Sequence, residues 1–174
     1  NFLFHNGLTA DGGGFLEDVT ESSGMNENND RYSFAPAWCD FDGDGWPDLS
    51  VANDFGRSNL SKNERGRFRA VASRAGVDGV GPGMSSAWFD YDGDGRPNLY
   101  ISNMWTASGQ RVVEDNAFVS APAEAFRDAY LMHTRGNALF RQPGHGPFHS
   151  TGPAGGGQAG AGGGGAGGAG VGAR

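Results

Sequence analysis

The sequence predicts an all-β fold built from repeated four-stranded antiparallel units. Two stretches, at 37–54 and 87–104, agree almost letter for letter, and they place Trp38 and Trp88 50 residues apart. Short runs rich in Val, Leu, Ile, Phe, Tyr and Trp alternate with Gly, Asn and Asp, which is typical of strands and turns. Four short strands in each period of this length are typical of one blade of a β-propeller.

Each repeat has the same order of expected elements: an aromatic strand, an aspartate-rich loop, an apolar strand, a third strand, and a short strand that ends at a glycine. In the apolar strand "DLSVAN", Leu49 and Val51 fall on alternate positions and therefore line one face. The third strand recurs as "NFLFHN", "SNLSKN" and "NALFRQ", which share a leucine at the third place. The fourth recurs as "FLEDVTESSGM" and "FRAVASRAGV", which align Gly24 with Gly76.

This order predicts a partial β-propeller within residues 1–150. The second half of one blade is expected at 1–25, a whole blade at about 33–77, and a second whole blade at about 84–150. A closed ring takes about four to eight blades, so we expect further blades of the same longer chain to complete it.

The second blade is lengthened by an insert at 106–135, in which a helix is expected at about 120–135. Pro122 lies near its start, Gly136 follows its end, and an apolar stripe runs between them. We expect this helix to cover a blade edge rather than to bind a partner. Residues 151–174 hold 13 of the 32 glycines and no apolar side chain large enough to pack, which predicts a disordered Gly/Ala-rich tail.

Composition excludes several classes of function. The net charge is −7 and Lys62 is the only lysine, which disfavours a nucleic-acid partner and suits a cation. The sequence has no apolar run long enough to span a membrane and no charged-then-apolar leader at its start. Because the first residue is Asn1 rather than Met, we expect a leader to belong to a longer precursor.

No catalytic constellation is visible, so the chain is not expected to be an enzyme. Cys39 is the only cysteine, which rules out an internal disulfide, and no activating partner for its thiol is evident. His145 and His149 are separated by Gly and Pro, which disfavours a zinc pair on one helix face.

The aspartate-rich loops predict cation sites. In the first loop, side-chain oxygens stand at positions 1, 3, 5 and 9, a glycine stands at position 6, and the carbonyl of position 7 adds another oxygen. The expected ligands are Asp40, Asp42, Asp44, the carbonyl of Trp46, and Asp48. Four carboxylates so close together repel each other unless a cation lies among them. Oxygen ligands without His or Cys select Ca²⁺, with Mg²⁺ or Mn²⁺ as weaker alternatives.

The second loop repeats the spacing with one change. Its expected ligands are Asp90, Asp92, Asp94, the carbonyl of Arg96, and Asn98. Because Asn removes a charge, we expect the second calcium site to be weaker than the first. The loops are not EF-hands, since position 12 is not Glu and the flanks are strand-like. The alternative is that the Asp-Gly pairs only form turns, although two copies with one spacing favour a metal.

These motifs resemble the FG-GAP/VCBS-repeat family of calcium-binding β-propellers, and in particular bacterial proteins similar to cartilage acidic protein, which often carry an ASPIC/UnbV domain. The resemblance rests on "WCDFDGDGWPDLSVANDFG", "AWFDYDGDGRPNLYISNMW", "RGNALFR" and "SRAGV", and covers about residues 1–148. It implies the ten ligands named above and a place outside the cell or in the cell envelope. The chain departs from the family in the turns "NERGRF" and "QPGHGPF", in Asn98, and in lacking the ASPIC/UnbV domain.

Two hypotheses follow. The first is a non-catalytic, calcium-stabilised propeller segment of a secreted or cell-envelope protein, used for adhesion or for binding a protein or carbohydrate. The second is an accessory part of a secreted hydrolase or lyase whose catalytic residues lie outside this chain.

Overall fold

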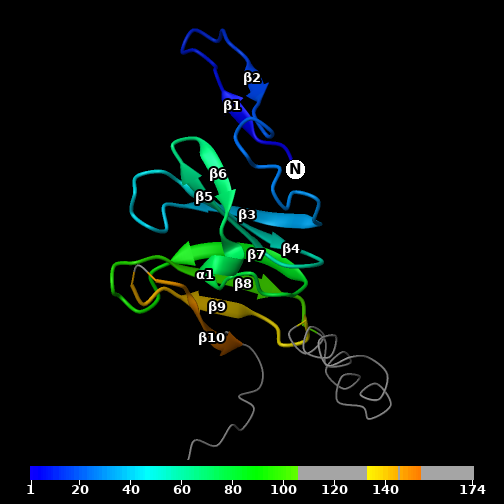
Figure 1. The fold of residues 1–174 in the computed structure, drawn as a ribbon, viewed down its shortest axis with the longest axis vertical. Coiled ribbons are helices and arrows are strands. Elements are labelled where there is room, and N and C mark those ends of the chain that lie inside the picture. Colours follow the sequence, from blue (N-terminus) through cyan, green and yellow to red (C-terminus); the bar gives the residue numbers. More distant parts are fainter. Residues whose placement is uncertain (106–132, 145, 154–174) are drawn as a thin grey trace, which may run out of the picture.

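The computed structural model shows an all-β fold (Figure 1). It describes residues 1–105, 133–144 and 146–153. The helix expected at about 120–135 and the tail expected at 151–174 therefore lie largely outside the described residues. No helix among the described residues is long and apolar enough to cross a membrane.

The strands of the described residues form three antiparallel sheets, and within each sheet consecutive strands of the chain lie side by side. The N-terminal sheet consists of β1 (Phe4–Asn6) and β2 (Leu16–Asp18). The central sheet consists of β3 (Ser33–Cys39), β4 (Asp48–Asn53), β5 (Asn59–Glu64) and β6 (Arg67–Ala70). The C-terminal sheet consists of β7 (Gly83–Phe89), β8 (Asn98–Asn103), β9 (Ala138–Arg141) and β10 (His149–Pro153). β10 thus includes the first three residues of the segment expected to be a tail.

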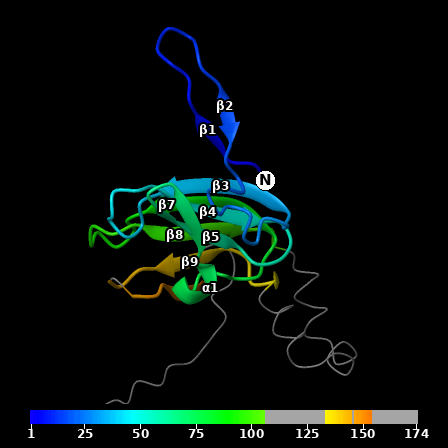
Figure 2. The same cartoon turned by 45° about the horizontal axis from the view of Figure 1, so that its top comes forward.

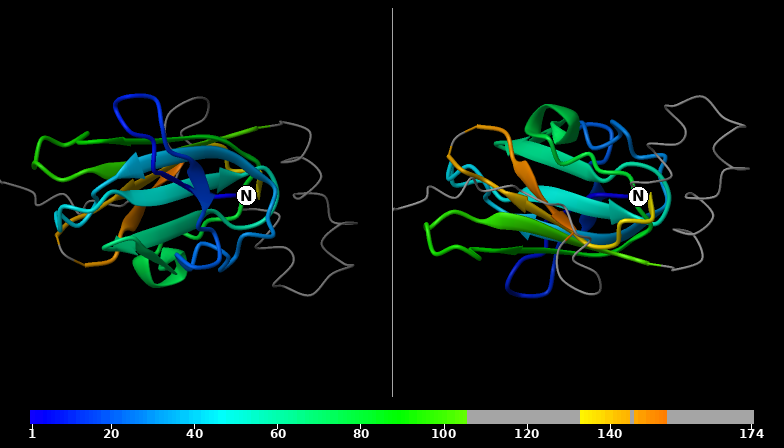
Figure 3. Two further views of the ribbon diagram at one scale, coloured as in Figure 1. Left: turned by 90° about the horizontal axis from the view of Figure 1, so that it is seen from above. Right: turned by 90° about the horizontal axis from the view of Figure 1, so that it is seen from below.

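The central sheet lies over the C-terminal sheet (Figures 2 and 3), and β3 and β4 both contact β7. Residues opposite each other on paired strands share a face, and Trp88 lies opposite Leu99 in the C-terminal sheet. That face packs against the central sheet, where Ala52 and Leu60 are fully buried. The main hydrophobic core therefore lies between these two sheets.

The segment "FRAVASRAGV" differs from its expected form. Instead of one strand that ends at glycine, β6 ends at Ala70 and a one-turn helix, α1 (Ala72–Ala75), follows it. Alanine and arginine favour a helix, and Gly76 ends it in a left-handed conformation with φ of 74°. A Cβ on Gly76 would lie 2.9 Å from the carbonyl oxygen of Phe148. The glycine is needed because the backbone passes so close to the next sheet.

The same arrangement occurs one repeat earlier, at Gly24. A glycine therefore stands at both aligned positions for the same reason, the close approach of the next sheet. Gly24 has φ of 84°, and its Cβ would lie 2.6 Å from the carbonyl oxygen of Phe68. The residue before each glycine accepts a hydrogen bond from the phenylalanine N–H, at 2.7 Å for Ser23 and 2.8 Å for Ala75. Each glycine-ended segment thus ties one sheet to the next.

Candidate metal centre

Both aspartate loops connect adjacent antiparallel strands at the same end of their sheets. Residues 40–47 join β3 to β4, and residues 90–97 join β7 to β8. The flanks are strands rather than helices, as the comparison with EF-hands predicted. At position 6, Gly45 and Gly95 have φ of 87° and 82°, a conformation that other residues rarely adopt.

The first aspartate of each loop folds the loop around itself. Asp40 accepts hydrogen bonds from the backbone N–H groups of Gly43, Asp44 and Gly45 at 2.8, 3.0 and 2.8 Å. Asp90 accepts the equivalent three bonds in the second loop at 2.8, 3.1 and 2.8 Å. The loop backbone therefore fixes the position of one carboxylate in each repeat.

Asp48 is fully buried where β4 begins. Its Oδ2 accepts a hydrogen bond from the N–H of Phe41 at 3.1 Å, and its Oδ1 accepts one from the N–H of Asn63 at 2.7 Å. Burial raises the pKa of Asp48 to about 6, although both hydrogen bonds oppose the shift. A buried carboxylate of this kind gains stability from any positive charge placed beside it.

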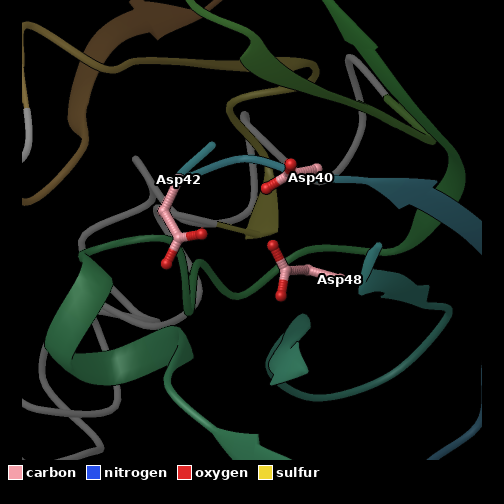
Figure 4. A group of neighbouring side chains, drawn as sticks. All are labelled: Asp40, Asp42 and Asp48. Atoms are coloured by element: carbon pink, nitrogen blue, oxygen red, sulfur yellow. The ribbon is translucent and has the colours of Figure 1, made fainter. Parts of the chain in front are cut away.

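Three carboxylates of the first loop converge on a shared space (Figure 4). Asp40, Asp42 and Asp48 each offer an oxygen, and these oxygens lie within 4.8 Å of one another. Oδ1 of Asp42 is buried and has no hydrogen-bond partner in the part of the chain that the structure describes. An unpaired buried carboxylate oxygen next to two others fits an oxygen-binding cation, so the residues of this loop could hold a metal ion.

Asp44, another expected ligand of the first loop, is placed differently. Oδ1 of Asp44 accepts the backbone N–H of Trp46 at 3.0 Å, and Oδ2 lies 3.1 Å from the ammonium nitrogen of Lys62. The N–H of Trp46, followed by Lys62, lowers the pKa of Asp44. Asp44 therefore faces Lys62 and lies outside the cluster of three.

Sequence reasoning missed the basic side chains that reach these loops. The ammonium of Lys62 contacts Asp42 as well as Asp44, and the guanidinium of Arg141 lies 2.5 Å from Asp92. A divalent ion is thus not the only counter-charge for the carboxylates. The signal was present in the alignment of "SNLSKN" with "NALFRQ", because Lys62 and Arg141 occupy the same fifth place.

The second loop also gathers three carboxylates, and none of these three residues is buried. Oxygens of Asp90, Asp92 and Asp94 lie within 4.8 Å of one another. The equivalent of Asp48 is the buried Asn98, whose Oδ1 accepts the N–H of Gln142 at 2.9 Å. Asn98 therefore keeps the hydrogen bond that Asp48 makes in the first loop, from the end of the loop to the backbone of the third strand or the residue directly after it.

Cys39 lies directly before the first loop. Its thiol is half-buried, and burial, followed by the charges of Asp40 and Asp48, raises its pKa to about 11. A thiol with this pKa is almost wholly protonated near neutral pH. Of the two histidines weighed as a zinc pair, His145 lies outside the described residues.

A family model described as an FG-GAP-like repeat matches residues 40–101. The match begins at the first aspartate of the first loop and ends within β8, so it includes both loops. A search of curated proteins found no match for the chain. The part of the chain that carries the clustered aspartates is therefore similar to an FG-GAP-like repeat.

Proposed function

We propose that this chain is a non-catalytic, calcium-binding segment of a β-propeller that works outside the cytoplasm, in a secreted or cell-envelope protein, in adhesion or in binding a protein or carbohydrate. The observation that carries the proposal is the convergence of Asp40, Asp42 and Asp48 within an FG-GAP-like repeat, with one buried carboxylate oxygen unpaired. The resemblance to calcium-binding propellers supports the choice of metal and of location.

The donor set favours Ca²⁺ over other metals. Every candidate ligand of the first loop is an oxygen, which suits hard cations and not zinc or copper. The loop also offers the carbonyl of Trp46, and Ca²⁺ accepts an irregular set of six to eight oxygens more readily than Mg²⁺ does. An ion bound here would tie the β3–β4 turn to β5, because Asp48 already bonds to Asn63. We assign it a structural role.

The propeller proposal is supported by the way in which the two larger sheets stack. Trp88 packs against the core, and its Nε1 donates a hydrogen bond to Oγ of Ser50 in the central sheet at 3.0 Å. The equivalent Trp38 faces the N-terminal sheet and is 50% exposed, and Phe34 beside it is 58% exposed. A cavity of about 360 Å³ lies next to them. The two-stranded N-terminal sheet covers this face only in part, and the face has the character of a surface that packs against a complete blade.

The proposal is tested by direct calcium binding. The purified chain, freed of metal with a chelator and then dialysed, is titrated with Ca²⁺ by isothermal calorimetry. We expect saturable binding that Asp42→Asn abolishes, because this variant removes the charge of a converging carboxylate. Asp54→Asn serves as the matched control, since Asp54 lies in the β4–β5 connection outside both loops. No binding by the native chain, or equal loss in both variants, would refute the calcium assignment.

A further inference from the structure

We infer that the second loop carries its own replacement for the cation. Arg96, Arg141 and Asn98 hold its aspartates, so that the first loop alone takes a divalent ion. The inference rests on the proposed function, because it concerns which of the two loops binds calcium. The sequence predicted two sites that differ in affinity, whereas the contacts in the second loop favour a turn that closes without metal.

The two loops differ in formal charge. The first contains four aspartates, and among the described residues its one basic partner is Lys62, which leaves a local charge of −3. The second contains three aspartates and has two basic partners, Arg96 and Arg141, which leaves a local charge of −1. Calcium affinity depends strongly on the charge of the ligand set, so the first loop attracts a divalent ion far more than the second does.

The hydrogen bonds show the same difference atom by atom. In the second loop Asp90 uses both oxygens for backbone N–H groups. Asp92 bonds to Arg141 at 2.5 Å through Oδ2 and to Nδ2 of Asn98 at 3.3 Å through Oδ1. Asp94 accepts the backbone N–H of Arg96 at 3.0 Å and its guanidinium at 2.6 Å. Every carboxylate oxygen of this loop thus has a partner, whereas Oδ1 of Asp42 in the first loop has none.

Asn98 reverses the polarity at the position of Asp48. Asp48 turns a second carboxylate oxygen into its loop, but Asn98 turns an amide N–H₂ group toward Oδ1 of Asp92 and the carbonyl of Arg96, at 3.3 and 3.4 Å. Both of those oxygens were expected to be calcium ligands. A donor that points at them satisfies the oxygens and repels a cation.

Arg96 and Arg141 also fix the loop to the neighbouring strand, as an ion would. Arg96 donates through Nε to the carbonyl of Gln142 at 3.3 Å, directly after the end of β9, and Arg141 lies within β9 itself. The unpaired oxygen close to this loop is Oε1 of Gln142, which belongs to a neutral amide. Charged hydrogen bonds from Arg96 and Arg141 therefore add to the Asn98 bond in tying the loop to β9.

The experiment counts calcium ions per chain by calorimetric titration. The native chain is expected to bind one ion, and Asp92→Asn is expected to leave this ion in place while Asp42→Asn removes it. The double variant Arg96→Trp with Asn98→Asp gives the second loop the residues of the first at positions 7 and 9, and so a local charge of −3. It is expected to bind two ions.

Each other result has a distinct meaning. Two ions of comparable affinity on the native chain, or loss of the ion in Asp92→Asn, would overturn the inference and leave the proposed function standing. No ion on the native chain would instead refute the proposed function. A melting temperature equal to that of the native chain shows that the double variant is folded. If this folded variant still binds only one ion, Arg96 and Asn98 do not block the second loop, and the inference fails. If the double variant fails to fold, the single variant Asn98→Asp takes its place. We expect this variant to show a weak second calcium site. The absence of a second site in it would count against the inference.

Discussion

Calcium is expected to raise the melting temperature of this protein through the first loop. Oxygens of Asp40, Asp42 and Asp48 lie within 4.8 Å of one another in the fold, and the unfolded chain offers no such cluster. An ion therefore binds the native state almost exclusively, and its binding free energy adds to the free energy of unfolding.

The size of the effect follows from the affinity expected for an extracellular module. With a dissociation constant of about 10⁻⁴ to 10⁻³ M, about 10 mM Ca²⁺ stabilises the fold by about 1.4 to 2.7 kcal/mol. In a domain of this size each kcal/mol raises the melting temperature by about 2–4 °C, so we expect a rise of about 3–11 °C.

Differential scanning calorimetry measures this rise against a chelator. A NaCl control at equal ionic strength separates specific binding from general screening of the acidic surface. Mg²⁺ is expected to raise the melting temperature less than Ca²⁺, because it tolerates an irregular oxygen set poorly. The same melting temperature with Ca²⁺ and with chelator, or an undiminished rise in Asp42→Asn, would refute the reasoning.

Three further predictions concern the fold around the site. Because the pKa of Asp48 in the folded protein is raised to about 6, its contribution to stability is present at low pH and is lost as the pH rises through 6. Chemical denaturation in chelator should therefore show about 1 kcal/mol more stability at pH 5 than at pH 7 from this group. Asp48→Asn should remove that difference. Gly76→Ala should lower the free energy of unfolding by at least about 1–2 kcal/mol, because φ is 74° and the new Cβ would meet the Phe148 carbonyl; an unchanged urea midpoint would contradict this. Trp88→Phe should lower the free energy of unfolding by about 1 kcal/mol or more, because it removes the hydrogen bond to Ser50. In a double-mutant cycle, Trp88→Phe should cost less in the Ser50→Ala chain than in the native chain. Equal costs in the two chains would show that the bond contributes nothing.

The local pattern of the sequence determined the main elements of the fold. Alternation of apolar residues in "DLSVAN" and the repeated loops predicted β4, β8 and the turns before them, because strand and turn preferences depend on neighbours in the chain. The family match to residues 40–101 supports the same repeat. The helix α1 was missed, since the expected strand and the observed turn of helix share the same glycine and the same apolar residues.

What the sequence by itself determined was that carboxylates recur at a spacing that suits a cation, because that spacing is a property of one short loop. Only the tertiary structure decided how each carboxylate is neutralised. Lys62 meets Asp42 across 20 positions of the chain, and Arg141 meets Asp92 across 49. Such contacts depend on how β5 and β9 are placed beside the loops, so no local pattern shows them. The difference between the two loops, one with an unpaired buried oxygen and one with every carboxylate oxygen bonded, arises from that packing.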